Sequence, residues 1–167
     1  AYSRRMFRVM ELCDGKVELF EGPEHVGPPP DGVMRWIDLR SQDEAQLELL
    51  RTRFEFHPLA IEDARHGHQR PKIEEYGDTV FTVMHMIEYA PTDELQVGEV
   101  CVFVGPNFVL SVRSRSTQSL LGVRERTERE PHLLRHGSSF VFYALMDAVV
   151  DRYFPLIDAM EDEIETI

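Results

Sequence analysis

Two acidic side chains, Glu62 and Asp63, stand next to each other directly after an apolar stretch that begins at Pro58. Proline suits the first turn of a helix, so residues 58–64 are expected to form a short helix that ends near this pair. Neighbouring carboxylates repel each other unless water or a cation screens them. Two interpretations stay open: a solvated helix end, or a site for a hard cation such as Mg²⁺ or Ca²⁺, which prefers oxygen ligands.

Asp147 is a second candidate, because it interrupts the apolar run 142–150. Burying an unpaired acid is costly. Asp147 is therefore expected to pair with an arginine, to face water at an interface, or to bind a metal ion. Asp151 follows four residues later, which places it on the same face of a helix, so one cation could bridge both carboxylates.

The histidines could bind a softer metal such as zinc. They are His57, His66, His68, His85, His132 and His136. His66-x-His68 offers two imidazoles, and His132 and His136 are four residues apart, but no cysteine or further histidine stands at ligand spacing. Histidines without a metal are therefore the favoured interpretation. The sequence also lacks Gly-x-Ser-x-Gly, His-Glu-x-x-His and a glycine-rich phosphate loop, so no enzyme is predicted.

The composition restricts the partners. The chain has 167 residues, enough for one domain with a real core, and a net charge of −12. An acidic surface repels nucleic acid and attracts cations. Two cysteines, Cys13 and Cys101, are too few for a disulfide framework, and both are predicted to be buried free thiols in a reducing compartment. No signal peptide is recognised, and the longest apolar stretch, residues 140–150, is too short to cross a membrane.

The elements that position these residues follow a clear order. Seven strands are predicted, over residues 7–12, 16–20, 33–39, 72–76, 79–89, 96–104 and 108–113. Helices are predicted from Ser41, which forms a capping box with Glu44, over 58–64, from Ser116 or Thr117 to 128, over 131–137, and from Ser138 or Ser139 onward. This order favours an α/β class with a mixed sheet of about seven strands. The helices at 41–64 should cover one face, and the helices after 113 the other.

The last helix is predicted to be long, with a kink at Pro155. Its apolar positions recur in a heptad pattern: Val150, Tyr153, Ile157, Met160, Ile164 and Ile167. Its final turns are acidic and carry no stop signal, so we expect the helix to continue in a longer natural protein. That acidic end is either a solvated face or a surface that concentrates cations. The predicted division is an α/β domain over 1–137 and the start of a stalk helix over 138–167.

Several runs, in order, resemble the CorA family of magnesium and cobalt ion transporters. They are Trp36-Ile37-Asp38-Leu39, the run from His57 to Ala64, the run from His68 to Tyr76, Val123-Arg124-Glu125-Arg126, and the run from Tyr143 to Phe154. The resemblance covers nearly the whole chain from about residue 33 and is weak before it.

The resemblance implies the N-terminal cytoplasmic domain of an inner-membrane transporter, an α/β/α sandwich that ends in a long stalk helix. Such transporters are homopentamers, in which divalent cations bound between neighbouring cytoplasmic domains hold the pore closed. Asp63 matches the main regulatory carboxylate, and Glu62 and Asp147 match a second inter-subunit site. The acidic partner of Asp63 would lie beyond Ile167. The implied ions are Mg²⁺ and Co²⁺, with Ni²⁺ or Zn²⁺ as further candidates.

Three alternatives remain at this stage. One is the related zinc transporter ZntB, although the intact Glu62-Asp63 pair favours CorA. The others, from different classes, are a soluble magnesium-dependent enzyme and a helical interaction module that uses the heptad pattern. The isolated chain is expected to be monomeric or weakly associating, because its heptad pattern is short.

Overall fold

The computed structural model describes residues 7–40, 43–67, 69–89, 94–114 and 121–167. Its strands are β1 (Phe7–Cys13), β2 (Lys16–Glu21), β3 (Val33–Leu39), β4 (Lys72–Tyr76), β5 (Thr79–Tyr89), β6 (Leu95–Val104) and β7 (Phe108–Ser114). Its α-helices are α1 (Glu44–Phe54), α2 (Pro58–His66), α3 (Leu121–Arg129), α4 (Ser138–Asp151) and α5 (Tyr153–Glu165). Two short 3₁₀ helices are η2 (Pro23–His25) and η3 (Pro131–His136). Element η2 lies in the connection between β2 and β3.

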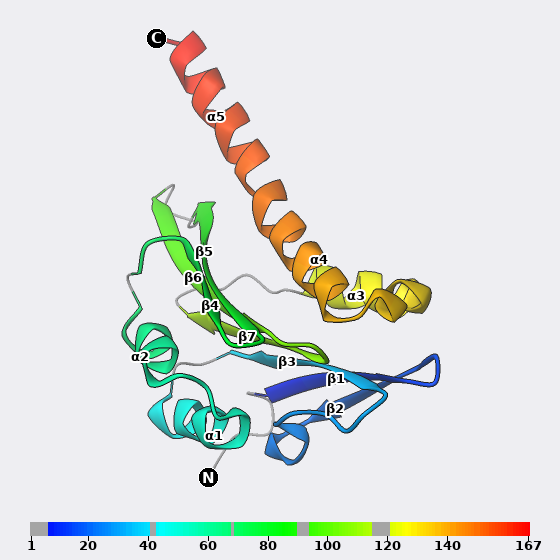
Figure 1. Ribbon diagram of the computed structural model, residues 1–167. Helices are drawn as coiled ribbons and strands as arrows, with labels where there is room; N and C mark the ends of the chain where they lie inside the picture. Colours follow the sequence, from blue (N-terminus) through cyan, green and yellow to red (C-terminus); the bar gives the residue numbers. More distant parts are fainter. Residues whose placement is uncertain (1–6, 41–42, 68, 90–93, 115–120) are drawn as a thin grey trace.

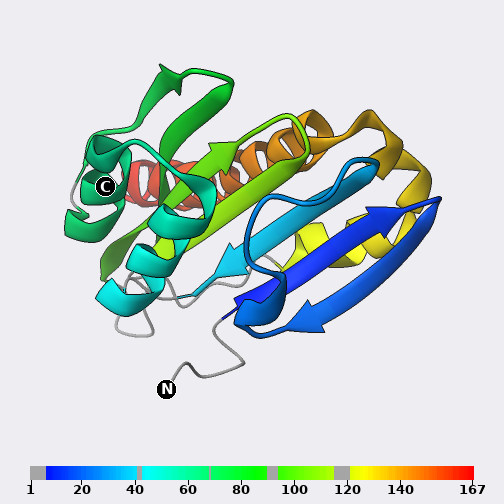
Figure 2. The ribbon, with the colours of Figure 1, turned by 60° about the horizontal axis from the view of Figure 1, so that its bottom comes forward.

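The strands form one seven-stranded sheet with the order β2-β1-β3-β7-β6-β5-β4 (Figure 2). Strands β3 and β7 pair in parallel, with Asp38 opposite Ser111, and the other pairs are antiparallel. The sheet is mixed because β3 and β7 are far apart in sequence, while β5, β6 and β7 follow one another through short connections. This confirms the predicted α/β class and the mixed sheet of about seven strands.

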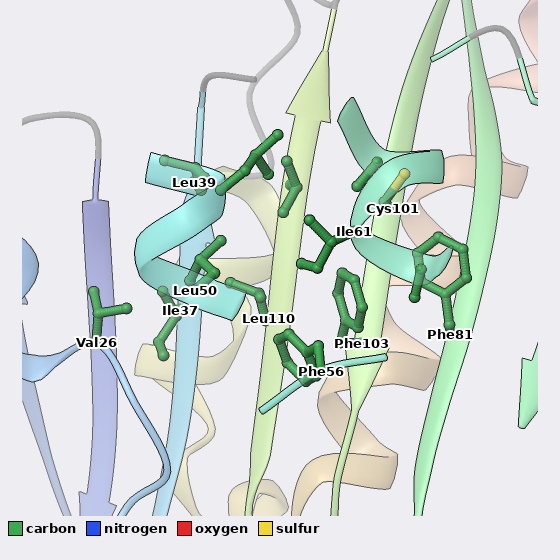
Figure 3. Close-up of a cluster of buried hydrophobic side chains, with 14 of the residues drawn as sticks. Val26, Ile37, Leu39, Leu50, Phe56, Ile61, Phe81, Cys101, Phe103 and Leu110 are labelled. Carbon is green, nitrogen blue, oxygen red and sulfur yellow. The ribbon is translucent and has the colours of Figure 1, made fainter. Parts of the chain in front are cut away.

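The two faces of the sheet are covered by different helices, as predicted (Figure 1). Helices α1 and α2 pack on one face through Leu47, Leu50 and Ile61, against a core that includes Ile37 and Phe103 (Figure 3). Helices α3 and α4 and the 3₁₀ helix η3 pack on the other face. There the core is built from Trp36, Val102 and Val109 of the sheet and from Val123, Leu134, Val141 and Leu145 of the helices. The central strands β3 and β7 send alternate side chains to the two cores, which explains their largely apolar sequences.

Two helix starts differ from the prediction. Helix α1 is capped by Asp43, whose Oδ1 accepts a hydrogen bond of 2.9 Å from the amide of Ala45. Ser41, the predicted cap, lies outside the described residues. Helix α4 begins at Ser138 and has no side-chain cap. The Ser138 hydroxyl donates instead to the carbonyl of Gly105 at 2.6 Å, so a contact to the β6–β7 turn replaces the expected local one.

Helices α4 and α5 follow one another as one long helical segment (Figure 1). A single residue with helical backbone angles, Arg152, separates them. Pro155 has no amide hydrogen and its ring crowds the preceding turn, so the boundary between the two helices lies just before it. The kink at Pro155 stays a prediction. Leu156 is the buried residue of α5, and the helix projects away from the sheet. Heptad positions such as Ile157 and Ile164 are exposed. No helix in the described part of the chain is both long and apolar enough to span a bilayer.

The prediction for the cysteines was half right. Cys101 is buried in the core beneath α1 and α2, and this burial raises the pKa of its thiol to about 12. Cys13 is exposed, because it ends β1 next to the Asp14-Gly15 turn. An apolar strand pattern does not show where the covering helices stop.

Candidate functional site

Asp63 lies in the last turn of α2. The helix starts where the Nδ1 atom of His57 accepts a hydrogen bond from the amide of Leu59, and it ends at Gly67. Gly67 has a φ of 66°, a conformation that glycine adopts without strain. The Asp63 side chain, 22% exposed, accepts a hydrogen bond of 2.5 Å from the Nζ atom of Lys72 in β4. Asp63 is thus paired with a cationic group of its own chain.

Lys72 is shared between two carboxylates. Its Nζ atom is 2.5 Å from Asp63 and 2.9 Å from Glu74. Hydrogen bonds to both acids raise the pKa of Lys72 to about 12. The ammonium group therefore stays charged at neutral pH, and it neutralises part of the negative potential at the end of α2.

Glu62 points away from this pair. Its side chain is 57% exposed, and its Oε1 atom is 3.6 Å from the Nε2 atom of His66. Glu62 therefore lies at a solvated helix end, whereas the neighbouring Asp63 is half-buried and paired with Lys72. Whether either residue binds a metal ion remains a prediction.

Asp147 pairs with an arginine, one of the three outcomes expected for it. Its Oδ2 atom is 3.6 Å from the Nη1 atom of Arg126 on α3, and its side chain is 41% exposed. The pair borders a cleft of about 200 Å³ between α3 and α4, and Asp151 lines the same cleft. The cleft opens to solvent, so the two carboxylates of α4 remain accessible to an ion or to another chain.

The candidate acids do not meet within one chain. Asp63 and Glu62 are on α2, on one side of the sheet, and Asp147 is on α4, on the other (Figure 1). In the described parts of the chain, no group of three or more histidine, cysteine, aspartate or glutamate side chains could hold a metal ion. His132 and His136 lie on the 3₁₀ helix η3, where residues four apart do not share a face. His68 lies outside the described residues.

Sequence reasoning missed a cluster of polar side chains on the face of the sheet that α1 and α2 cover. Glu99 of β6 is 5% exposed and lies opposite His85 of β5, with 3.9 Å between its Oε1 atom and the Nε2 atom of His85. Its Oε2 atom has no hydrogen-bond partner. Ser114, the neighbour of Glu99 on β7, is also buried with an unbonded hydroxyl. The acid in the otherwise apolar run 97–104 was the available signal for this group.

A second buried network lies on the α3 side of the sheet. Asp38 accepts hydrogen bonds from the Ser111 hydroxyl at 2.8 Å and from the Nη2 atom of Arg113 at 2.7 Å. The indole of Trp36 donates to the same hydroxyl at 3.1 Å. The network therefore joins the parallel strands β3 and β7, and it accounts for the tryptophan and the acid two residues apart in β3.

Comparisons with known proteins agree on one family. The model of a family described as CorA-like Mg²⁺ transporter protein matches residues 31–167. The YfjQ protein of Bacillus subtilis, whose name assigns it to metal ion transport, is 37% identical over 138 residues, which cover 83% of this chain and 42% of that protein. The cobalt/magnesium transport protein CorA of Thermotoga maritima is 34% identical over 116 residues, which cover 68% of this chain and 33% of that protein. The chain thus spans less than half the length of these curated relatives.

A solved structure shares the fold. The soluble domain of CorA from Methanocaldococcus jannaschii superimposes with a TM-score of 0.64 at 14% sequence identity, over 95% of this chain and 62% of that domain. At this identity the likeness concerns the fold alone. It agrees with the seven-stranded mixed sheet and the long C-terminal helical segment described above.

Proposed function

We propose, since the chain belongs to the family of CorA-like Mg²⁺ transporter proteins, that it is the cytoplasmic, cation-sensing domain of a divalent-cation transporter. The transporter would lie in the inner membrane and transport Mg²⁺ or Co²⁺, and its membrane-spanning part would lie outside these 167 residues. The domain itself would conduct no ion. Its task would be to bind the ion between subunits and thereby hold the pore closed. Both curated relatives described above are named for ion transport, which favours this function over the soluble-enzyme alternative.

The observation that carries the proposal is the surroundings of Asp63. A carboxylate in the last turn of a helix faces the negative end of the helix dipole, so a cation beside it is favoured. In this chain Lys72 occupies that place at 2.5 Å, and Glu62 and Glu74 add negative charge nearby. Mg²⁺ is usually held by one or two carboxylates and keeps several of its waters. We expect a hydrated divalent ion to compete with Lys72 for Asp63.

The placement of Asp147 supports a ring of subunits. In a cyclic ring of more than two subunits, each interface joins two different surfaces of the same chain. Asp63 and Asp147 lie on opposite faces of the sheet, so a heterologous contact can bring the α2 face of one subunit toward the α4 face of the next. This arrangement suits the proposed homopentamer and a second site that includes Glu62 and Asp147. The division into a body over 1–137 and a stalk from 138 onward stays part of the proposal.

Weak sites are sufficient for such a sensor. Shifting a two-state equilibrium from about 1:99 to about 99:1 needs about 5.5 kcal/mol of differential binding. Five equivalent interfaces would supply this at about 1 kcal/mol each. A site that already contains Lys72 as a competitor can operate in this low-affinity range.

The test uses the full-length protein and the substitution Asp63→Ala. We expect Mg²⁺ to protect the wild-type domain from proteolysis, and the variant to need several-fold more Mg²⁺ for the same protection and for inhibition of uptake. Asp78→Ala, an exposed aspartate in the β4–β5 turn, is the matched control and should behave as wild type. Unchanged protection and inhibition in Asp63→Ala would contradict the proposal. Repeating the titration with Co²⁺, Ni²⁺ and Zn²⁺ determines the preferred ion, including the ZntB-like alternative.

A further inference from the structure

Three hydrogen bonds, joined by short stretches of the chain, connect Asp63 on one side of the sheet with α5 on the other. Lys72 donates to Asp63 at 2.5 Å, and Gln69 lies three residues before Lys72 in the segment that enters β4. The carbonyl of Gln69 is 2.6 Å from the Nε2 atom of His85. The carbonyl of His85 accepts a hydrogen bond of 2.6 Å from the Tyr153 hydroxyl, in the first turn of α5.

The edge of the sheet makes this connection possible. Strand β4 pairs with β5 only as far as Lys72, which lies opposite Val83. Beyond Val83 the edge of β5 is no longer covered by β4, and His85 is two residues further along. The segment before β4 reaches the His85 side chain from one side, and Tyr153 reaches its main chain from the other. His85 is thus the residue at which the two connections meet.

The proton on His85 has a defined place. A carbonyl oxygen only accepts hydrogen bonds, so the Nε2 atom must carry the hydrogen that bonds to Gln69. The buried Glu99 carboxylate lies 3.9 Å from the same nitrogen. A carboxylate at this distance favours an N–H that points toward it and toward Gln69, which restricts rotation of the ring. The imidazole is therefore held between the segment that enters β4 and strand β6.

We propose that His85 is a positioning residue that couples the state of Asp63 to the attachment of α5. When the carboxylate of Asp63 loses its negative charge, its charge-assisted bond to Lys72 becomes an ordinary, weaker hydrogen bond. The short segment 69–72 is then anchored less firmly. The Gln69 carbonyl then holds His85 less firmly, and the main chain of His85 offers a less fixed acceptor to Tyr153. A role of this coupling in gating the pore would rest on the proposed function. The coupling itself needs no bound metal ion.

The experiment therefore uses the 167-residue chain without metal and measures hydrogen exchange of the amides in the first two turns of α5. Asp63→Asn removes the negative charge, and we expect it to accelerate this exchange about three- to tenfold, the range for weakening one charge-assisted hydrogen bond. In a Tyr153→Phe background, which lacks the hydrogen bond from the Tyr153 hydroxyl to the His85 carbonyl, Asp63→Asn should cause no further acceleration of exchange. Asp78→Asn and Tyr143→Phe, an exposed aspartate and an exposed tyrosine, are the controls.

Substitutions at His85 separate coupling from general destabilisation. His85→Gln keeps an N–H donor that can reach the Gln69 carbonyl, so it should keep the effect of Asp63→Asn, whereas His85→Ala should abolish it. Lys72→Met perturbs the other partner and should reproduce the Asp63→Asn acceleration. Equal acceleration with and without the Tyr153 hydroxyl, or in His85→Ala, would overturn the proposal, as would no acceleration at all. Failure of metal sensing would appear separately, in the Mg²⁺ titration of the full-length protein.

Discussion

Replacing Asp38 by alanine is expected to destabilise the fold more than replacing an exposed acidic residue by alanine would. Asp38 is 7% exposed and joins β3 to β7 through Ser111 and Arg113. The Ser111 hydroxyl also receives the indole N–H of Trp36. Asp38→Ala therefore removes the central acceptor of a buried network and leaves the guanidinium of Arg113 without this carboxylate.

The expected size follows from burial. The Arg113 side chain is 7% exposed and its Nη2 atom lies 2.7 Å from Asp38. Removing one partner of a buried ion pair costs about 3–5 kcal/mol, because the remaining charge stays in a poorly solvated place. A domain of this size has about 5–15 kcal/mol of stability in total. We expect a loss of about 3 kcal/mol, which would leave a domain at the low end of this range with only about 2 kcal/mol of stability.

Urea unfolding followed by tryptophan fluorescence measures this loss, because Trp36 is the single tryptophan and belongs to the network. The double variant Asp38→Ala/Arg113→Met removes the buried positive charge together with its carboxylate, so it should recover part of the stability. Asp31→Ala, an exposed turn aspartate, should unfold like the wild type. A loss below about 1 kcal/mol, or a double variant no more stable than Asp38→Ala, would refute the reasoning.

Two further predictions concern pKa values. The folded state raises the pKa of Lys72 from 10.5 to about 12, so the stability from its pairing with Asp63 is fully present below pH 10.5 and is lost as the pH rises through 12. Thermal melts of wild type and Lys72→Met should differ at pH 9 and converge toward pH 12, and a constant difference would contradict the assignment. For the thiols, Cys13 should react with a disulfide reagent in the native chain, while Cys101, with its pKa raised to about 12 by burial, should react only after unfolding in urea. Two fast thiols in native buffer would show that Cys101 is accessible.

Strand positions could be predicted from the sequence because they depend on local patterns. The ranges 33–39 and 72–76 agree with β3 and β4 residue for residue. Apolar runs bounded by glycine and proline turns define such strands with no knowledge of the rest of the fold. Helix starts were less predictable, since a cap depends on what else a side chain can reach. Ser138 bonds to Gly105, 33 residues away in sequence, and no local pattern indicates this.

The candidate sites show the same division. The sequence singles out Asp63 and Asp147 because paired acids and an acid in an apolar run are unusual by themselves. It does not show Lys72 or Arg126 as their partners, because these contacts arise from strand pairing and helix packing. The Glu99 and His85 pair was missed for a related reason. Only the register of β5 and β6 places the two residues opposite each other.

The pairing of the candidate acids has a consequence for how the domain responds to ions. Asp63 is bonded to Lys72 and Asp147 to Arg126, so the domain does not depend on a metal ion to offset these charges, despite a net charge of −12. If a divalent cation binds as proposed, it would have to compete with a cation of the protein, which would lower its affinity but would also make its arrival change a contact that already exists. At Asp63 that contact would be the one to Lys72, from which the proposed connection to α5 starts. A weak site in such a position would suit a sensor, because binding there would replace one defined arrangement of the chain with another.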